Sequence, residues 1–598
     1  MKRLVSIALL FACIALTAFA GEPNTSTETA KLHALFDAEW EWTLREFPES
    51  ATRVGDNRYN DKLTDLSAAA IERRKAHERE VLQRIGAIDR SRLSGQDVVS
   101  YELFLREAKL TVEQQRFPMG RIPFFSGYIV PYEWQPVSAM AGIHIDIPAL
   151  PRSAPLRNTK DYDDFLARLV AYPKQIDQVI DLMRRGIASG WVLPEVPMRR
   201  VPAQIEAQLV VDVTKSPLYK PFEKFPEGIA ESERVRLTAK GRTTIADAVI
   251  PALKRLDTFI VETYLPAGRK DIAASTLPGG ATYYEAEIRR NTTTDLSARE
   301  IHDVGKREVA RIRKEMDGII MRVGFQGTFP SFLQFLRTDP RFYYAKGDEI
   351  LPGYRNIAKR VDPELPKLFA ELPRLPYGIR EIPAYQGETA EYYSTGAADG
   401  SRAGYFNAYT GNAAARPKFG MEDLFLHEAV PGHHLQISRA KEIKGLPQFR
   451  RNGWYTAYGE GWALYAESLG EELGLYTDAY SKFGQLNFEI LRAVRLVVDT
   501  GMHAFGWSRQ QAIGYMRENT GLAESFIETE VDRYIVWPGQ ALGYKIGELK
   551  IKELRAKAQK ALGEKFDIRK FHNALLDDGA LPLDLLEQRI DVWIKTQQ

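Results

Sequence analysis

Amphipathic helical patterns recur along most of this sequence and constrain its fold more than any other feature. Apolar side chains return every three or four residues over long stretches, which is typical of helices that bury one face. The predicted helices cover residues 31–47, 66–88, 100–115, 161–187 and 231–263, another runs to about 322, and helix follows helix from 421 to the end. Capping signals in residues 293–300 mark the start of one of them. We therefore predict a mainly α fold.

Strand-like patterns are short and few. They cover residues 377–385 and 405–409, which is enough for a small sheet. The 598 residues are too many for one ordinary core, so we expect more than one lobe. The break at Pro278, Gly279 and Gly280 is the best dividing point. It predicts an N-terminal helical lobe over 21–280 and a second lobe over 281–598.

The first twenty residues have the pattern of an export signal. Lys2 and Arg3 precede an apolar run over residues 4–20 that ends in an A-x-A pattern. We predict a signal peptide over 1–20 and an exported, periplasmic or secreted protein that is not stably inserted in a membrane after cleavage. Lipid attachment at Cys13 is the weaker alternative, because Phe11 is bulky and apolar sequence continues past the cysteine.

Cysteine and charge content exclude several classes of protein. Cys13 is the only cysteine, so the mature chain can form neither a disulfide nor a cysteine-ligated zinc or iron–sulfur site. The chain has 81 Lys and Arg against 79 Asp and Glu, and loss of Lys2 and Arg3 makes the two numbers equal. This balance argues against a nucleic-acid partner, which would require a basic excess.

Three of the nine histidines fall within eight residues, at His427, His433 and His434, and Glu428 follows the first. The zinc-peptidase signature H-E-x-x-H places its histidines at i and i+4 on one helix face, with the glutamate as general base. Here the spacing is i+6 or i+7. In a regular helix the i+6 side chain points away from the starting face, and i+7 lies ~10.5 Å along the axis. Two imidazoles so separated cannot share an ion at ~2.0–2.1 Å.

A proline–glycine pair offers a solution to this geometry. Pro431 lacks an N–H and its ring opposes the carbonyl of His427, while Gly432 permits unusual backbone angles. We predict that the helix bulges here and brings His433 close to His427. The alternative is that the pair simply ends a helix and the histidines are ordinary. Three histidines and a glutamate after an apolar lead favour a metal site.

A third ligand is expected downstream, at Glu460, 27 residues after His433. Glu467 follows seven residues later on the same helix face, where it would hold one of the ligands by hydrogen bonding. The alternative is a pair of surface carboxylates. The aromatic neighbours Trp454, Tyr458 and Trp462 argue instead for a packed helix, in which a bare carboxylate needs a partner.

These residues carry a resemblance to known families. The segment from His427 to Gln436 resembles the H-E-A-V-P-G-H-H-L-Q signature of a bacterial family of largely uncharacterised exported proteins. Further similar segments are 291–296, 399–402, 460–467, 499–503 and 534–541. More distantly, the chain is similar to the helical zinc metallopeptidases of the thimet oligopeptidase and angiotensin-converting enzyme type. It departs from them by a two-residue insertion between Glu428 and Gly432, which leaves His433 or His434 as the second ligand, with His433 favoured.

The resemblance implies a large two-lobed helical metallopeptidase-like fold with the small sheet beside the metal-binding helix. It also implies one zinc ion per chain, held in the lobe 281–598 by His427, His433 and Glu460. The expected activity is hydrolysis of peptide bonds by a metal-activated water, with Glu428 as general base. Candidates for stabilising the oxyanion are His503, Tyr534, Arg533 and Tyr544, and the resemblance supports His503 most.

Substrate contacts are expected near the second strand-like run. If residues 404–409 form an edge strand, Tyr405 and Asn407 would help to hold an extended peptide by strand addition, and Tyr544 would also contact it. The alternative is an internal strand of the sheet. Arg402 is a candidate anchor for a substrate carboxylate, although solvent-facing arginines are commoner.

Two other functions remain open. A zinc amidohydrolase or isopeptidase acting on a non-peptide amide would use the same residues. A non-catalytic peptide-binding protein would keep the peptide-binding residues without catalysing hydrolysis. Glu428 argues against this function, because a structural zinc site needs no adjacent base. The expected partner is therefore a peptide or amide substrate.

Overall fold

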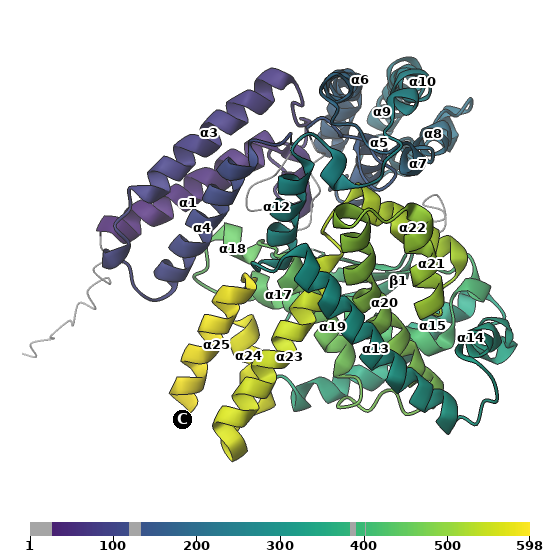
Figure 1. Cartoon of the computed structure of the whole chain (residues 1–598). Helices are drawn as coiled ribbons and strands as arrows, with labels where there is room; N and C mark the ends of the chain where they lie inside the picture. The colour runs from purple at the N-terminus through teal and green to yellow at the C-terminus, as the bar shows by residue number, and fades with distance from the viewer. Residues whose placement is uncertain (1–26, 119–132, 383–389, 401) are drawn as a thin grey trace, which may run out of the picture.

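The computed structural model describes residues 27–118, 133–382, 390–400 and 402–598 (Figure 1). The predicted signal peptide and Cys13 lie outside the described residues. Within them the protein is mainly α-helical with one small sheet, which confirms the predicted fold class. None of the helices in these ranges combines the length and apolar character required to cross a bilayer.

The helices of the N-terminal part follow the predicted positions closely. In chain order they are α1 (Thr27–Glu46), α2 (Pro48–Val54), α3 (Ala68–Gly86), α4 (Gly95–Gln114), α5 (Ile143–Ala149), α6 (Thr159–Ser189), α7 (Glu195–Met198), α8 (Val201–Glu206), α9 (Glu231–Thr244), α10 (Ile250–Phe259) and α11 (Leu265–Ala267). Two π-helical turns, η5 (Ile245–Val249) and η6 (Ile260–Tyr264), connect α9, α10 and α11. The predicted helix over 231–263 is therefore helical throughout.

The C-terminal part contains most of the long buried helices. In chain order they are α12 (Gly280–Thr292), α13 (Ala298–Arg322), α14 (Phe329–Thr338), α15 (Ile350–Val361), α16 (Met421–Glu428), α17 (His433–Glu442), α18 (Gln448–Arg451), α19 (Thr456–Ser468), α20 (Ala479–Ala504), α21 (Arg509–Asn519), α22 (Glu524–Val536), α23 (Leu542–Leu562), α24 (Ile568–Leu576) and α25 (Leu583–Gln597). Ser297 and Glu300 form a reciprocal capping box at the start of α13, as the capping signals predict.

The sheet consists of β1 (Tyr377–Glu381), β2 (Tyr392–Ser394) and β3 (Gly404–Ala408) in the order β1-β3-β2. β3 is parallel to β1 and antiparallel to β2, so it is the middle strand. The edge-strand expectation for residues 404–409 is therefore wrong, and the internal-strand alternative is right. Phe406 of β3 packs against Phe425 of α16, which places the sheet beside the helix that carries His427.

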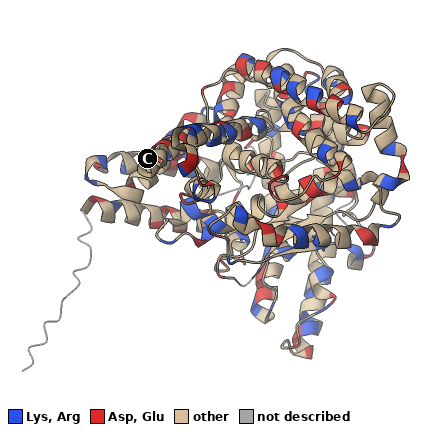
Figure 2. Cartoon of the chain, turned by 90° about the horizontal axis from the view of Figure 1, so that it is seen from below, with Lys and Arg blue, Asp and Glu red and all other residues tan. Residues whose placement is uncertain are grey.

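Hydrophobic cores connect distant parts of the chain. One core joins the N-terminal helices α1 and α4 to the C-terminal part, where Phe36 and Phe104 pack on Phe449 with ring centroids 4.9 and 5.3 Å apart. A second core is built from residues 66–264, and a third packs α13 and α20 side by side (Figure 1). The first core crosses the boundary suggested near residue 280, and the division into two lobes stays a prediction. Basic and acidic residues are interspersed along the helices (Figure 2).

Candidate metal centre

The chain breaks between α16 and α17, at residues 429–432. The predicted bulge inside one helix is wrong: α16 ends at Glu428 and a new helix begins at His433. A Cβ atom on Gly432 would lie 2.0 Å from the carbonyl oxygen of His427 and 2.3 Å from that of Leu426. Only glycine lets the backbone fold back this closely on the end of α16. The break therefore turns His433 toward His427.

Helix α19 holds this turn from the other side. The indole Nε1–H of Trp462 donates a hydrogen bond to the carbonyl oxygen of Pro431, at 2.9 Å. Trp462 is fully buried, so the contact is shielded from water. The same helix carries Glu460 two residues earlier. Trp462 therefore helps to hold the turn in place. Its sequence context had suggested only that it packs in the core.

His427, His433 and Glu460 converge at one point. Glu460 Oε2 lies 3.6 Å from His427 Nε2 and 3.4 Å from His433 Nε2, and one ligand atom from each residue falls within 4.8 Å of the others. Tetrahedral coordination at ~2.0–2.1 Å separates ligand atoms by roughly 3.3 Å. Glu460 Oε2 is buried and has no hydrogen-bond partner. The three side chains thus fit a single zinc ion in chemistry and in spacing.

The electrostatics of the cluster favour a positive charge at its centre. Burial lowers the pKa of His427, but the carboxylates of Glu460 and Glu467 outweigh burial and raise it to about 9. Burial likewise acts against the charge of Glu460, yet the two imidazoles hold the pKa of Glu460 well below its usual range. A divalent cation would satisfy the same carboxylate.

Glu467 contacts His427 as the helix spacing predicts. Its Oε1 lies 2.7 Å from His427 Nδ1, which leaves Nε2 directed to the cluster. Arg492 of α20 forms an ion pair with the same carboxylate at 3.3 Å. Burial and the adjacent Glu467 raise the pKa of Asp423 well above its usual range. Asp423 precedes His427 by four residues, a spacing that places both side chains on one face of α16. The sequence carried no such signal for Arg492.

His434 faces away from the cluster. Its Nε2 hydrogen-bonds the carbonyl oxygen of Leu375 at 3.0 Å, and its Nδ1 contacts the hydroxyl groups of Tyr393 and Ser438 at 3.0 and 3.3 Å. Burial lowers its pKa to about 4, so the imidazole is neutral. Of the two alternatives, the cluster contains His433, and His434 ties α17 to the sheet region.

Glu428 sits beside the cluster and is held by the sheet. Its Oε2 accepts a hydrogen bond of 2.8 Å from the backbone N–H of Tyr393 in β2. Burial raises the pKa of Glu428, against the opposing effect of His427 and His433. A carboxylate with a raised pKa accepts a proton more readily near neutral pH. Tyr393 therefore contributes both a backbone contact to Glu428 and a hydroxyl contact to His434, and the sequence carried no signal for either.

His503 and Tyr534 have their side-chain polar atoms engaged within the fold, which argues against their expected role as oxyanion donors. His503 Nδ1 accepts from the N–H of Ala274 at 3.0 Å, and its Nε2 contacts the carbonyl oxygen of Tyr534 at 2.9 Å. The hydroxyl of Tyr534 donates to Glu530 at 2.6 Å and accepts from Arg495 at 2.9 Å. Both residues are almost fully buried with their polar atoms already paired, so they connect segments of the fold.

The residues expected around β3 also serve the fold. Asn407 is fully buried, and its amide nitrogen donates to Tyr392, Ser394 and Tyr405 while its oxygen accepts from Arg380 at 2.8 Å. No polar atom of Asn407 is left for a substrate, so that expectation is wrong. The Arg380 guanidinium lies 4.2 Å from the centroid of the Tyr405 ring. Arg402 donates to the carbonyl oxygen of Arg53 at 3.3 Å.

Of the predicted residues, Tyr544 lies on α23, which packs against the helix α19 that carries Glu460, and Arg533 contacts Tyr544. Helix α23 approaches α19 so closely that a Cβ atom on Gly547 would lie 1.7 Å from the carbonyl oxygen of Ala457. Tyr544, on the same helix, has its pKa raised by burial and then by the carboxylate of Glu460. Its hydroxyl lies 3.4 Å from Arg533 Nη2. Tyr544 is thus the best placed of the four candidate oxyanion donors.

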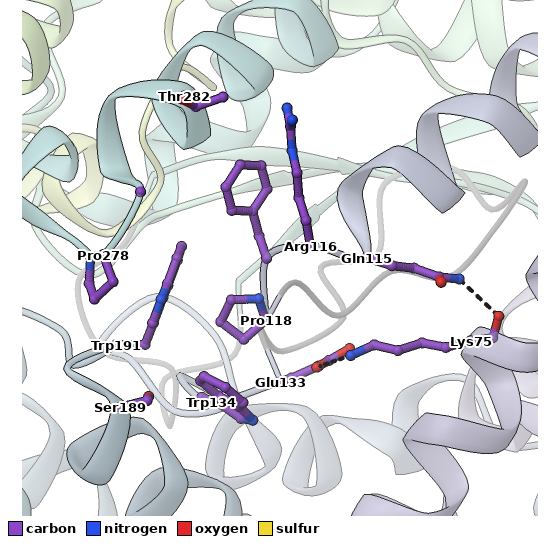
Figure 3. A pocket seen from close by; sticks show the side chains of 12 residues that line it. Lys75, Gln115, Arg116, Pro118, Glu133, Trp134, Ser189, Trp191, Pro278 and Thr282 are labelled. Atoms are coloured by element: carbon purple, nitrogen blue, oxygen red, sulfur yellow. Dashed lines mark hydrogen bonds and ion pairs between the residues drawn. The ribbon is translucent and has the colours of Figure 1, made fainter.

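A cavity of about 490 Å³ lies elsewhere, between the N-terminal helices and the start of α12 (Figure 3). Phe117, Trp134 and Trp191 contribute aromatic walls, and Lys75 forms an ion pair with Glu133 at 2.8 Å. None of the cluster residues lines this cavity, so it is separate from the candidate metal centre.

Comparison with known proteins relates the chain to proteins of unknown function. A family model described as a bacterial protein of unknown function (DUF885) matches residues 48–590. The structure of a candidate lipoprotein from Colwellia psychrerythraea has 30% sequence identity and a TM-score of 0.89 over 96% of this chain and 100% of that one. A candidate lipoprotein of unknown function from Shewanella oneidensis has 16% identity and a TM-score of 0.69 over 93% of this chain and 99% of that one, which indicates a shared fold. No curated protein matches the chain.

Proposed function

The chain belongs to the bacterial family DUF885, and from the geometry of its histidine–glutamate cluster we propose that it is a zinc-dependent metallopeptidase. The observation that carries the proposal is the convergence of His427, His433 and Glu460 with Glu428 beside them. Two imidazoles and one carboxylate are a ligand set of catalytic zinc sites, which keep a fourth position for water or substrate. Zinc held there would supply Lewis-acid activation of a water and of the scissile carbonyl group.

Glu428 is the proposed general base. It takes a proton from the attacking water and passes that proton to the leaving amine, so one carboxylate serves both halves of the reaction. The N–H of Tyr393 orients Glu428, and Glu467 orients His427. Tyr544 is the proposed donor to the oxygen of the attacked carbonyl group, because His503 and Tyr534 have their polar atoms paired within the fold.

A zinc amidohydrolase or isopeptidase that acts on a non-peptide amide is the second candidate, because the same residues serve it. A non-catalytic peptide-binding protein is disfavoured by the placement of Glu428, whose raised pKa suits proton transfer beside the ligands. The proposed partner is a peptide or amide substrate, and the near balance of charge gives no reason to propose nucleic acid.

The proposed location is outside the cytoplasm. The first twenty residues have the composition of an export signal, and two proteins of similar structure are described as candidate lipoproteins. Lipid attachment through Cys13 thus stays open beside cleavage after Ala20. The mass of the mature N-terminus separates the two, because a chain lipidated at Cys13 carries acyl chains and retains eight more residues, residues 13–20.

A digest of a peptide library tests the proposed function. The zinc-loaded protein is incubated with the library, with and without a chelator, and the products are read by mass spectrometry. We expect chelator-sensitive cleavage by the native protein, and we expect Glu428→Gln to bind zinc with a turnover lower by about 10³-fold or more. Undiminished cleavage by Glu428→Gln would refute the role of Glu428, and no cleavage by the native protein would refute the peptidase.

A further inference from the structure

Arg495, which is buried, and Arg533, which is half-buried, each have a buried guanidinium nitrogen that no protein atom accepts. Arg495 Nη1 and Arg533 Nε are both buried and lack a hydrogen-bond partner. Arg495 is 5% exposed, so its guanidinium group lies away from bulk water. Buried polar atoms are nearly always paired, and exceptions of this kind point to a strained place or to a ligand.

The ion pairs of these two arginines meet at one carboxylate. Glu530 is the one carboxylate that pairs with both, at 2.7 Å from Arg495 Nη2 and 3.1 Å from Arg533 Nη1. The other contacts of Arg533 are neutral, to Gln540 at 2.6 Å and to Tyr544 at 3.4 Å. Asp499 takes its hydrogen bonds from Tyr284 and the N–H of Gly539. Asp499 also attracts Arg533 through its charge, but Glu530 is the carboxylate with which the two guanidinium groups form ion pairs.

Tyr544 connects this pair to the candidate metal centre. Arg495 lies against the face of its ring at 4.5 Å from the centroid, and Arg533 approaches its hydroxyl. Gly543 and Gly547, on either side of Tyr544, pack on Thr456, Ala457 and Gly461 of α19 with almost no space for a Cβ atom. Glu460 belongs to that same stretch of α19 and acts on Tyr544 through its charge, so Tyr544 lies between the arginine pair and the candidate metal centre.

We propose that Arg533, supported by Arg495 and Tyr544, binds a carboxylate of the substrate, and that this carboxylate is the free C-terminus of a peptide. Arg533 offers Nε and Nη2 on one edge, a planar pair that matches the two oxygens of a carboxylate. The amide of Gln540 would give up its bond to Nη2 in the process. A carboxylate held so near the ligands places the scissile bond close to the chain end, so the protein acts as a carboxypeptidase.

This inference rests on the proposed function for the site and is tested first by binding. The zinc-loaded Glu428→Gln variant is titrated with a peptide bearing a free C-terminus and with the same peptide as its C-terminal amide. A third peptide is amidated and carries an aspartate at its last position. We expect the free acid to bind between about ten- and a hundred-fold more tightly than the amide, the range for a charge-assisted contact. Equal binding of acid and amide would overturn the proposal, and preference for the aspartyl amide would assign the site to an acidic side chain instead.

Variants then locate the contact. In the same background, Arg533→Gln is expected to bring the ratio of the affinities for the free acid and for the amide close to one. Arg533→Lys is expected to keep part of the preference for the free acid. Arg509→Gln is the matched control, because Arg509 is an arginine paired to Asp532 at 2.7 Å on a neighbouring helix and should retain the ratio. Tyr544→Phe removes only the hydroxyl group. In the otherwise native protein, lower turnover with an unchanged ratio of acid to amide affinity would assign that hydroxyl to the carbonyl oxygen. An unchanged ratio in Arg533→Gln, with a normal circular dichroism spectrum, excludes Arg533.

Hydrolysis separates this inference from the proposed function. If the native protein cleaves the free acid and the amide at equal rates and at internal bonds, the peptidase stands and the carboxylate site falls. If neither peptide is cleaved but the free acid still binds more tightly, the peptidase falls and the carboxylate site stands.

Discussion

His433 and His434 are adjacent in sequence and serve different parts of the molecule. One imidazole points to His427 and Glu460, and the other is held by Leu375 and Tyr393. A helix separates neighbouring side chains by ~100°, so two adjacent histidines cannot enter one small site together. The start of α17 at His433 therefore decides which of them is a ligand.

Substitution of each histidine provides a direct comparison. We expect His433→Ala to lose stoichiometric zinc, whereas His434→Ala keeps about one zinc per chain. His434→Ala should lower the free energy of unfolding by about 1–3 kcal/mol, because it leaves the carbonyl oxygen of Leu375 without its donor. Metal analysis by mass spectrometry and denaturant unfolding measure the two effects. The opposite pattern of zinc retention would exchange their roles.

Glu467 is predicted to act through His427 and not on the substrate. Glu467→Gln weakens the contact to His427 Nδ1 and leaves the buried Arg492 without its carboxylate. We expect the zinc affinity to fall about 10–100-fold, in line with other residues that orient metal ligands. Competition with a chromophoric chelator gives the affinity. Glu471→Gln, on the exposed side of the following turn and paired with Lys482, should leave it unchanged.

At the scale of elements, the break between α16 and α17 depends on one glycine. Gly432→Ala places a methyl group 2.0 Å from the carbonyl oxygen of His427, a contact that backbone atoms cannot relieve without moving the helix end. We expect this variant to lose zinc affinity and at least about 2 kcal/mol of stability.

Gly514→Ala is the matched control for that substitution. Gly514 lies inside α21 with no atom within 4 Å of the added methyl group. Alanine is a better helix former there, so this variant should be more stable by about 0.5–1 kcal/mol. Thermal unfolding of both proteins measures the difference, and equal effects at the two positions would contradict the steric argument.

At the scale of the whole molecule, Asp499 connects α20 to α12 and to the loop before α23. Its carboxylate accepts from the Tyr284 hydroxyl at 2.6 Å and from the N–H of Gly539 at 3.1 Å. Burial is the main cause that raises its pKa from 3.8 to about 7, despite these hydrogen bonds. The folded protein thus binds a proton here more tightly than the unfolded chain does.

The sign of the resulting pH dependence follows from linkage. A raised folded-state pKa contributes stability that is complete below pH 3.8 and is lost as the pH rises to about 7. The loss is about 4 kcal/mol at most, from roughly three pKa units. Asp499→Asn should lack this decrease of stability with pH, and its amide oxygen can still accept the hydrogen bond from Tyr284. Denaturant midpoints of both proteins between pH 4 and 8 test it; parallel curves would exclude Asp499 as the titrating group.

The positions of the helices could be predicted from local sequence, and so could the residues of the histidine–glutamate cluster. The helix predicted over 161–187 appears within two residues of its bounds, and the helix predicted to end near 322 ends there, because hydrogen bonds and caps of helices are local. His427 and Glu460 were identified by residue type and spacing. The pairing of the strand at 404–409 could not be predicted, because the sequence of one strand does not show whether it pairs on one side or on both.

A helical protein without an internal disulfide, which carries histidines and a glutamate around a proline–glycine pair, could be inferred from the residues alone. Which polar atoms are already paired depends on how distant segments pack. His503, Tyr534 and Asn407 have residue types suited to a site, yet partners from Ala274, Glu530 and Arg380 occupy them. The physical reason is range: a helix forms from contacts within one turn, whereas a buried side chain finds its hydrogen-bond partner wherever long-range packing brings one.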